Sequence, residues 1–119
     1  MPLGKEDCML IQVMDWVKHH HFDKFIFHVA NERFTTPHSG ALLKRKGVLA
    51  GVSDILILKP SNGYNGAAIE LKMPLGRLTK PQKTFLETAH DNGYFVGVCY
   101  SAESAIKAIK DYLMIDHHK

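Results

Sequence analysis

The sequence predicts an α/β fold in which a four-stranded mixed sheet is flanked by helices. Three observations lead to this prediction. Four short apolar runs are rich in β-branched and aromatic residues, as strands are. The segments between them carry apolar residues at helical spacing. The two middle runs are separated only by turn-forming residues, so they are expected to pair as a hairpin. The expected order is helix, strand, short helix, strand, strand, helix, strand, helix.

Length and composition are those of one compact domain spanning residues 1–119, with no room for a second. Hydrophobic residues make up 45% and charged residues 23%, which is typical of globular proteins. No apolar run is long enough to span a membrane and no signal pattern opens the chain, so a cytoplasmic protein without a membrane partner is expected. Cys8 and Cys99 are expected to be free thiols.

The N-terminal half is predicted to contain two helices and one strand. Residues 6–20 form the first helix, because apolar residues recur there at helical spacing at Leu10, Val13, Met14 and Val17. Residues 25–30 form the first strand. Residues 39–46 form a short helix with Ser39 as its N-cap and Gly47 as its stop.

Glu6 lies on the apolar stripe of the first predicted helix. Two interpretations remain open for it. An acid in a first turn is favoured by the helix dipole, and an acid in line with the core face can also point into a site.

The C-terminal half begins with the predicted hairpin, whose strands cover residues 54–58 and 67–73. Residues 79–92 form the next helix, opened by the capping-box sequence Thr79-Lys80-Pro81-Gln82. Residues 94–100 form the fourth strand. Ser101 caps a last helix that runs to about residue 113.

Three charged residues of the hairpin suggest a site. Side chains alternate along a strand, so Glu70 and Lys72 project to one side while Ile69 and its alternate neighbours project to the other. Asp54 opens the partner strand, so two carboxylates and an amine meet at one end of the sheet. Solvated strand charges remain the alternative, but the apolar surroundings favour a bound partner. A divalent metal ion beside a cation is the chemistry that hydrolyses a phosphodiester.

The formal net charge is only +3, but basic residues bracket the candidate site in sequence. Lys44, Arg45 and Lys46 precede it, and Arg77, Lys80 and Lys83 follow it. A phosphate-binding surface and a solvated basic loop are both compatible with this pattern. The histidines are interpreted as solvated helix ends or, for His28, as a core or rim residue.

Taken together, these residues resemble the virus-type replication-repair nucleases, the VRR-Nuc family of the PD-(D/E)XK nuclease superfamily. The resemblance runs from about residue 31 to residue 113. Ser53 is a departure, because the family usually has proline before the first acid. The matching segments are Asn31-Glu32, Lys46-Gly47, Gly51-Val52-Ser53-Asp54, Ala68-Ile69-Glu70-Leu71-Lys72, Gly76-Arg77-Leu78-Thr79, Gln82 and Gly93-Tyr94.

The resemblance implies a restriction-endonuclease-like core and a role for each motif residue. Asp54, Glu70 and the backbone carbonyl of Leu71 would bind Mg²⁺ or Mn²⁺. Lys72 would position or activate the attacking water. Gln82 would act near that lysine, although the capping box alone also explains a glutamine there.

Glu6 and Glu32 are candidate auxiliary acids, since related junction-resolving nucleases often carry an acid on the first helix. The basic residues Lys44, Arg45, Lys46, Arg77 and Lys80 are candidate DNA contacts.

The implied function is a structure-selective DNA endonuclease that acts on Holliday junctions or related branched DNA. The resemblance also implies a homodimer and a phage or prophage origin in a bacterial host. A nickase, a flap nuclease or a less selective nuclease is the alternative within the same chemistry. A non-catalytic DNA-binding protein is the alternative of another class, and absence of Mn²⁺ binding would favour it.

Overall fold

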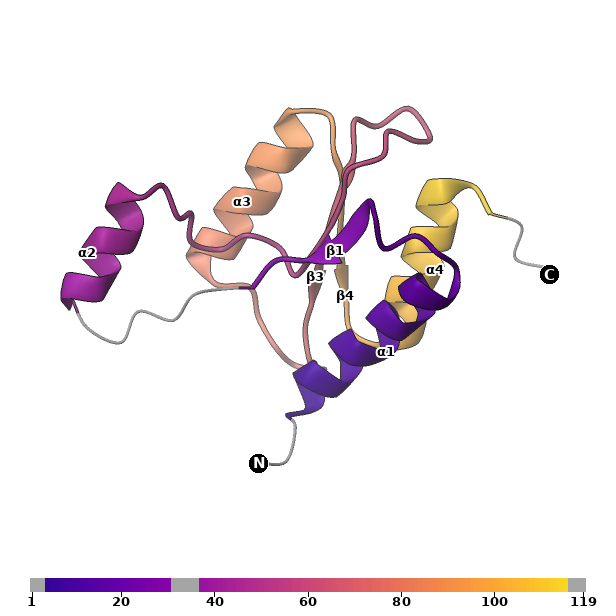
Figure 1. Ribbon diagram of the computed structural model, residues 1–119, viewed down its shortest axis with the longest axis horizontal. Coiled ribbons are helices and arrows are strands. Elements are labelled where there is room, and N and C mark those ends of the chain that lie inside the picture. The colour runs from indigo at the N-terminus through magenta and orange to yellow at the C-terminus, as the bar shows by residue number, and fades with distance from the viewer. Residues whose placement is uncertain (1–3, 31–36, 116–119) are drawn as a thin grey trace.

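The computed structural model describes residues 4–30 and 37–115 of the chain. Its elements follow the predicted order (Figure 1). They are α1 (Lys5–His19), β1 (Ile26–His28), α2 (Pro37–Arg45), β2 (Ile55–Ile57), β3 (Ala67–Leu71), α3 (Lys80–Asp91), β4 (Phe95–Cys99) and α4 (Ala102–Leu113).

The strands form one mixed sheet in the order β1-β2-β3-β4. β1 pairs antiparallel with β2, and β2 pairs antiparallel with β3. β3 pairs parallel with β4, with α3 as the crossover between them. The predicted α/β class and the four-stranded mixed sheet are therefore confirmed.

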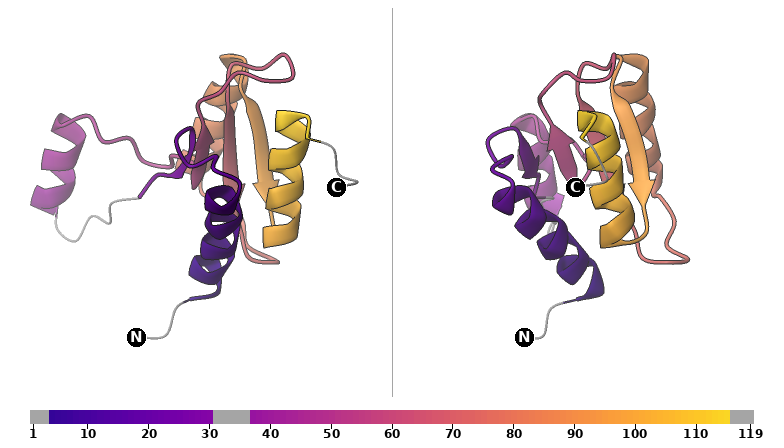
Figure 2. Two further views of the ribbon diagram at one scale, coloured as in Figure 1. Left: turned by 45° about the vertical axis from the view of Figure 1, so that its right-hand side comes forward. Right: turned by 90° about the vertical axis from the view of Figure 1, so that its right-hand side faces the viewer.

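Helices cover both faces of the sheet (Figure 2). α1 and α4 lie on one face, where their apolar stripes pack on alternate residues of the strands such as Ile55, Ile57 and Ile69. α3 lies on the other face and buries Leu86 there. The sheet is thus buried between layers, and its open end carries the charged residues described below.

The hairpin turn between β2 and β3 fixes their register. Asn62 and Gly63 both have positive φ, 51° and 82°, and Ser61 and Tyr64 form a bridge around them. This is the pattern of a type I′ turn, whose twist suits antiparallel strands. The register pairs Ile55 with Ile69.

Several element ends differ from the predictions. The strands are shorter than the apolar runs, since strand pairing ends where the partner strand turns away. α2 begins at Pro37, so Ser39 lies inside the helix and the prediction of Ser39 as N-cap is wrong. Gly47 follows the helix with a φ of +90°, as expected of a stop residue. Glu32 lies outside the described residues.

α2 stands apart from the rest of the protein (Figure 1). Among the described residues it makes no packing contact with any other helix or strand. No helix in the described ranges has the length and apolar character needed to cross a membrane.

Candidate active site

The register of the hairpin places Asp54 directly opposite Glu70, one pair beyond Ile55 and Ile69. Residues opposite one another in an antiparallel pair project to the same face of the sheet. Ile69 and Leu71 project into the core with α1 and α4, so Glu70 projects to the face covered by α3. The two acids are therefore cross-strand neighbours at one end of the sheet.

Asp54 is held through both its backbone and its side chain. The backbone N–H of Leu71 donates a hydrogen bond to Asp54 Oδ2 at 2.8 Å. The backbone carbonyl of Asp54 accepts hydrogen bonds from the N–H of Val29 at 3.0 Å and from Nδ1 of His28 at 2.7 Å. These bonds tie Asp54 to β1 on one side and to β3 on the other.

Glu70 is buried, with 2% of its surface exposed. Its Oε2 accepts a hydrogen bond from Gln82 Nε2 at 3.2 Å. Its Oε1 is also buried and has no hydrogen-bond partner among the described residues. A buried carboxylate oxygen without a partner is costly unless a cation or a proton satisfies it. This oxygen therefore fits a metal ion.

The pKa of Glu70 reflects the same environment. The pKa is raised from 4.5 to about 8, chiefly by burial and further by the nearby Asp54 carboxylate and by the charge of Glu6, while Lys72 lowers it. Without a bound cation, the Glu70 carboxyl group is thus mostly protonated at neutral pH.

Gln82 combines the two roles that the sequence left open. Its Oε1 accepts from the backbone N–H of Thr79 at 2.9 Å, and Thr79 Oγ1 accepts from the backbone N–H of Gln82 at 3.3 Å, which completes the capping box. Because the cap occupies Oε1, the Nε2 group is directed to Glu70. The cap of α3 and the support of Glu70 are therefore made by one side chain.

These groups surround a cavity of about 350 Å³. Glu6 lines it from the first turn of α1, so this acid both follows the dipole preference and faces the site. Its other lining residues are Asp7, Leu10, His28, Asp54, Glu70, Leu71, Lys72 and Gln82. Among the described residues, no three His, Cys, Asp or Glu side chains converge closely enough to form a metal cluster by themselves. Any metal ion here would need a backbone oxygen or water as well as the two acids.

Comparisons with known proteins agree with this geometry. A family model described as the VRR-NUC domain matches residues 6–103. The chain belongs to the VRR-NUC family. A solved structure named as a VRR_NUC domain protein is similar to it, with 27% sequence identity, a TM-score of 0.81 and coverage of 97% of this chain and 93% of the other. No protein with a curated function matches the chain.

Membership of the VRR-NUC family makes this protein a nuclease domain of the PD-(D/E)XK type, with DNA as the implied substrate. Nucleases of this family generally use divalent metal ions, in keeping with the oxygen ligands that face the cavity.

The basic residues of this VRR-NUC chain fall into two groups. Arg77 and Lys80 are exposed. Arg77 lies on the segment that joins β3 to α3 and Lys80 is the first residue of α3, at the same end of the sheet as the cavity. Lys44 and Arg45 lie in the last turn of α2, and Lys46 follows it, away from the body of the protein (Figure 1). The fold thus places the first group beside the site and the second group at a distance from it.

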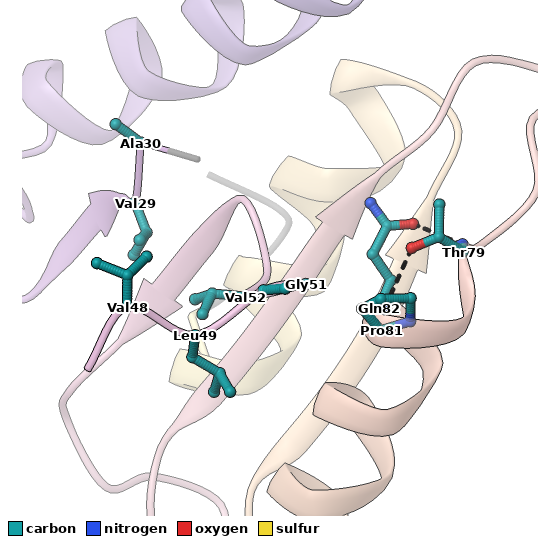
Figure 3. A pocket seen from close by; sticks show the side chains of 10 residues that line it. Val29, Ala30, Val48, Leu49, Gly51, Val52, Thr79, Pro81 and Gln82 are labelled. Atoms are coloured by element: carbon teal, nitrogen blue, oxygen red, sulfur yellow. Dashed lines mark hydrogen bonds between the residues drawn. The ribbon is translucent and has the colours of Figure 1, made fainter. Parts of the chain in front are cut away.

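A second, more apolar cavity of about 450 Å³ adjoins the site of this VRR-NUC chain (Figure 3). The loop of residues 48–52 forms one wall and the start of α3 the other, with Thr79 and Gln82 at the border. Gly51 is packed so closely there that a Cβ atom would lie 2.4 Å from the backbone of Pro81. The glycine therefore allows two backbones to approach each other.

Sequence reasoning missed Asp7 and the position of His28 in the cavity. Both reach the site because α1 and β1 pack beside the hairpin, and such long-range packing leaves no periodic signal in the sequence. The position of His28, three residues before the Asn31-Glu32 segment, was the only hint.

Proposed function

We propose that this VRR-NUC protein is a metal-dependent endodeoxyribonuclease that hydrolyses phosphodiester bonds in branched DNA. The observation that carries the proposal is the cross-strand pair of Asp54 and Glu70. Glu70 Oε1 is buried without a hydrogen-bond partner among the described residues, and Lys72 lines the same cavity. We infer that residues 1–119 act as one domain.

Asp54, Glu70 and the carbonyl oxygen of Leu71 would hold the metal ion. In an extended strand, the N–H and C=O groups of one residue point toward the same neighbouring strand. The N–H of Leu71 reaches Asp54, so its carbonyl is directed to the side of the sheet where Asp54 lies. This orientation supports a role as the third oxygen ligand. Glu6 stands within the cavity as an auxiliary acid.

The oxygen ligands favour a hard cation, Mg²⁺ or Mn²⁺. When bound, such an ion lowers the pKa of a coordinated water and neutralises charge on the phosphate. Lys72 contributes independently, because its ammonium group can donate a hydrogen bond to the attacking water or to the phosphate oxygen on which charge develops. Gln82 keeps Glu70 in place through its 3.2 Å hydrogen bond.

Recognition of the substrate is expected to depend on DNA shape and on phosphate contacts. Arg77 and Lys80 lie beside the cavity, and Lys44, Arg45 and Lys46 form a second basic group at the end of α2, at a distance from it. Four-way junctions of the Holliday type are the proposed substrate. Equal cutting of flaps or linear duplex would instead identify a less selective nuclease.

A homodimer would supply two active sites for paired cuts across a junction. The isolation of α2 supports this proposal, since Leu42 is 47% exposed and its helix packs on no other helix or strand among the described residues.

The test is cleavage of a synthetic four-way junction by wild-type protein and by Asp54→Ala, Glu70→Ala and Lys72→Ala, with Mg²⁺ or Mn²⁺. We expect each variant to lose cleavage by about two orders of magnitude or more, while it stays folded and still binds DNA. Glu87→Ala is the matched control, because Glu87 is an exposed acid on α3 that does not line the cavity.

Near-normal metal-dependent cleavage by two of the three site variants would refute the assignment. Calorimetry with Mn²⁺ distinguishes the nuclease from a non-catalytic DNA-binding protein, since the latter would bind DNA but no metal.

A further inference from the structure

The segment between β3 and α3 exposes one large apolar side chain almost completely. Leu75 is 98% exposed, whereas the other exposed large apolar residues of the described ranges have between 37% and 70% of their surface exposed. Single apolar residues on a surface are common, so exposure alone assigns no role.

The backbone around Leu75 provides a second observation. The N–H of Gly76 donates to the carbonyl of Met73 at 2.8 Å, which closes a four-residue turn with Pro74 in its second position. Leu75 occupies the third position with a φ of +70°. These are the marks of a type II turn, in which glycine or asparagine is usual at that position.

A leucine in the left-handed region costs about 1–2 kcal/mol. The strain does not improve packing, since the side chain touches solvent rather than the core. The turn thus holds a large apolar group away from the protein at a cost in stability. Such strain is typically retained at sites of function.

The position of the turn indicates what the side chain meets. The segment connects Lys72 to Gln82, and both of these residues line the cavity. Arg77 and Lys80 follow the turn, are exposed and can contact phosphates. Leu75 therefore lies on the segment that connects two residues of the cavity, between Lys72 and Arg77 in the sequence.

We propose that Leu75 is a wedge that inserts between bases at the branch point of the DNA substrate. Apolar side chains inserted at a base step unstack it at a cost of a few kcal/mol, and that cost is smallest where stacking is already interrupted. The wedge therefore favours branched DNA over continuous duplex. This inference rests on the proposed nuclease function and adds a residue that selects the substrate.

The test uses a four-way junction with 2-aminopurine at the branch point, whose fluorescence rises when the base is unstacked. Glu70→Gln serves as the parent, so that the DNA is bound but not cut. We expect the parent to raise the fluorescence several-fold and the double variant with Leu75→Asn to leave it near that of free DNA. Asparagine tolerates positive φ, so the turn is kept while the apolar group is lost.

Leu58→Asn in the same background is the matched control. Leu58 is another exposed leucine, 58% exposed. It directly follows β2, whereas Asp54 directly precedes that strand, so the two residues lie at opposite ends of β2. It should retain the full fluorescence rise. In the otherwise wild-type protein, Leu75→Asn should lower the ratio of junction to duplex cleavage several-fold and leave the rate on duplex unchanged.

A full fluorescence rise with Leu75→Asn would overturn the wedge, even if the protein is a nuclease. Loss of self-association in Leu75→Asn, with an unchanged cleavage ratio, would identify a protein contact instead. If wild-type protein cuts no DNA, the nuclease proposal fails, and the fluorescence of the bound junction still decides whether Leu75 unstacks it.

Discussion

Glu70 links metal binding to proton release. A carboxyl group must lose its proton to bind a cation, and burial beside Asp54 raises the Glu70 pKa to about 8. Metal affinity should therefore increase as the pH rises toward 8. In the protein without metal, burial of the charged Glu70 carboxylate also lowers the free energy of unfolding.

The first prediction concerns Glu70→Gln. The folded protein holds a proton on Glu70 up to about pH 8, whereas the unfolded chain releases it near 4.5. Between these values the folded state binds more protons, so stability falls as the pH rises, by up to about 1.4 kcal/mol per pH unit from this group. Glutamine does not titrate, so the variant should lack this loss. Urea unfolding of both proteins at pH 5 and pH 8, with a metal chelator present, measures this difference in stability.

Glu87→Gln provides the comparison, because it removes an exposed acid from α3 and should unfold with the pH dependence of wild type. If Glu70→Gln loses stability between pH 5 and pH 8 by the same amount as wild type, Glu70 does not have the raised pKa.

Sequence reasoning reached the site residues of the hairpin by local rules. Strand alternation and a tight turn are enough to predict that Asp54, Glu70 and Lys72 share one end of the sheet, and the cavity includes all three. Their catalytic roles remain predictions. Asp7 and His28 could not be predicted, because their approach depends on how α1 and β1 pack against the hairpin.

At the scale of elements, the start of α3 is positioned by the loop before β2. Gly51 has a φ of +82° and lies against the backbone of Pro81, next to Gln82. This contact sets the distance between α3 and the hairpin, and with it the hydrogen bond from Gln82 to Glu70.

The second prediction is that Gly51→Ala destabilises the protein and slows cleavage. Alanine at the positive φ of residue 51 alone lowers stability by about 1 kcal/mol. The added Cβ must also displace the start of α3. Gly63→Ala is a matched control, because Gly63 has the same φ of +82° and nothing within 4 Å of the added atom.

Urea unfolding and the cleavage rate, measured on both variants, test this prediction. We expect Gly51→Ala to lose more stability than Gly63→Ala and to reduce the turnover number, while Gly63→Ala keeps it. Equal losses of stability and full activity in both would show that the contact with Pro81 does not position Gln82.

The order and type of all eight elements follow from hydrophobic periodicity and turn residues. The first and last residues of these elements are predicted less accurately from the sequence. Ser39 has the chemistry of an N-cap, yet α2 begins at Pro37, where a fixed φ also suits a first turn. The strands stop short of their apolar runs because pairing depends on the neighbouring strand, which the local sequence does not describe.

At the scale of the whole molecule, α2 lacks support from the other helices and strands that the structure describes. A helix of 9 residues has little stability alone in water. It packs on no other helix or strand among the described residues, and Leu42 on it is 47% exposed. A second subunit that covers this helix would supply the missing contacts, which supports the proposed homodimer. No sequence pattern distinguishes an apolar residue that packs against a second subunit from one that packs in the core of its own subunit.

The last prediction is that Leu42→Asp converts a dimer to a monomer without lowering the melting temperature of the monomeric body, because α2 packs on no other helix or strand among the described residues. Sedimentation velocity gives the mass, and calorimetry gives the melting temperature. Ile11→Asp is the matched control, since Ile11 is 43% exposed on α1. A wild-type monomer at assay concentrations would contradict the homodimer. A dimer broken by Ile11→Asp and not by Leu42→Asp would place the interface on α1, and paired cuts across a junction would then require a different arrangement of the two active sites.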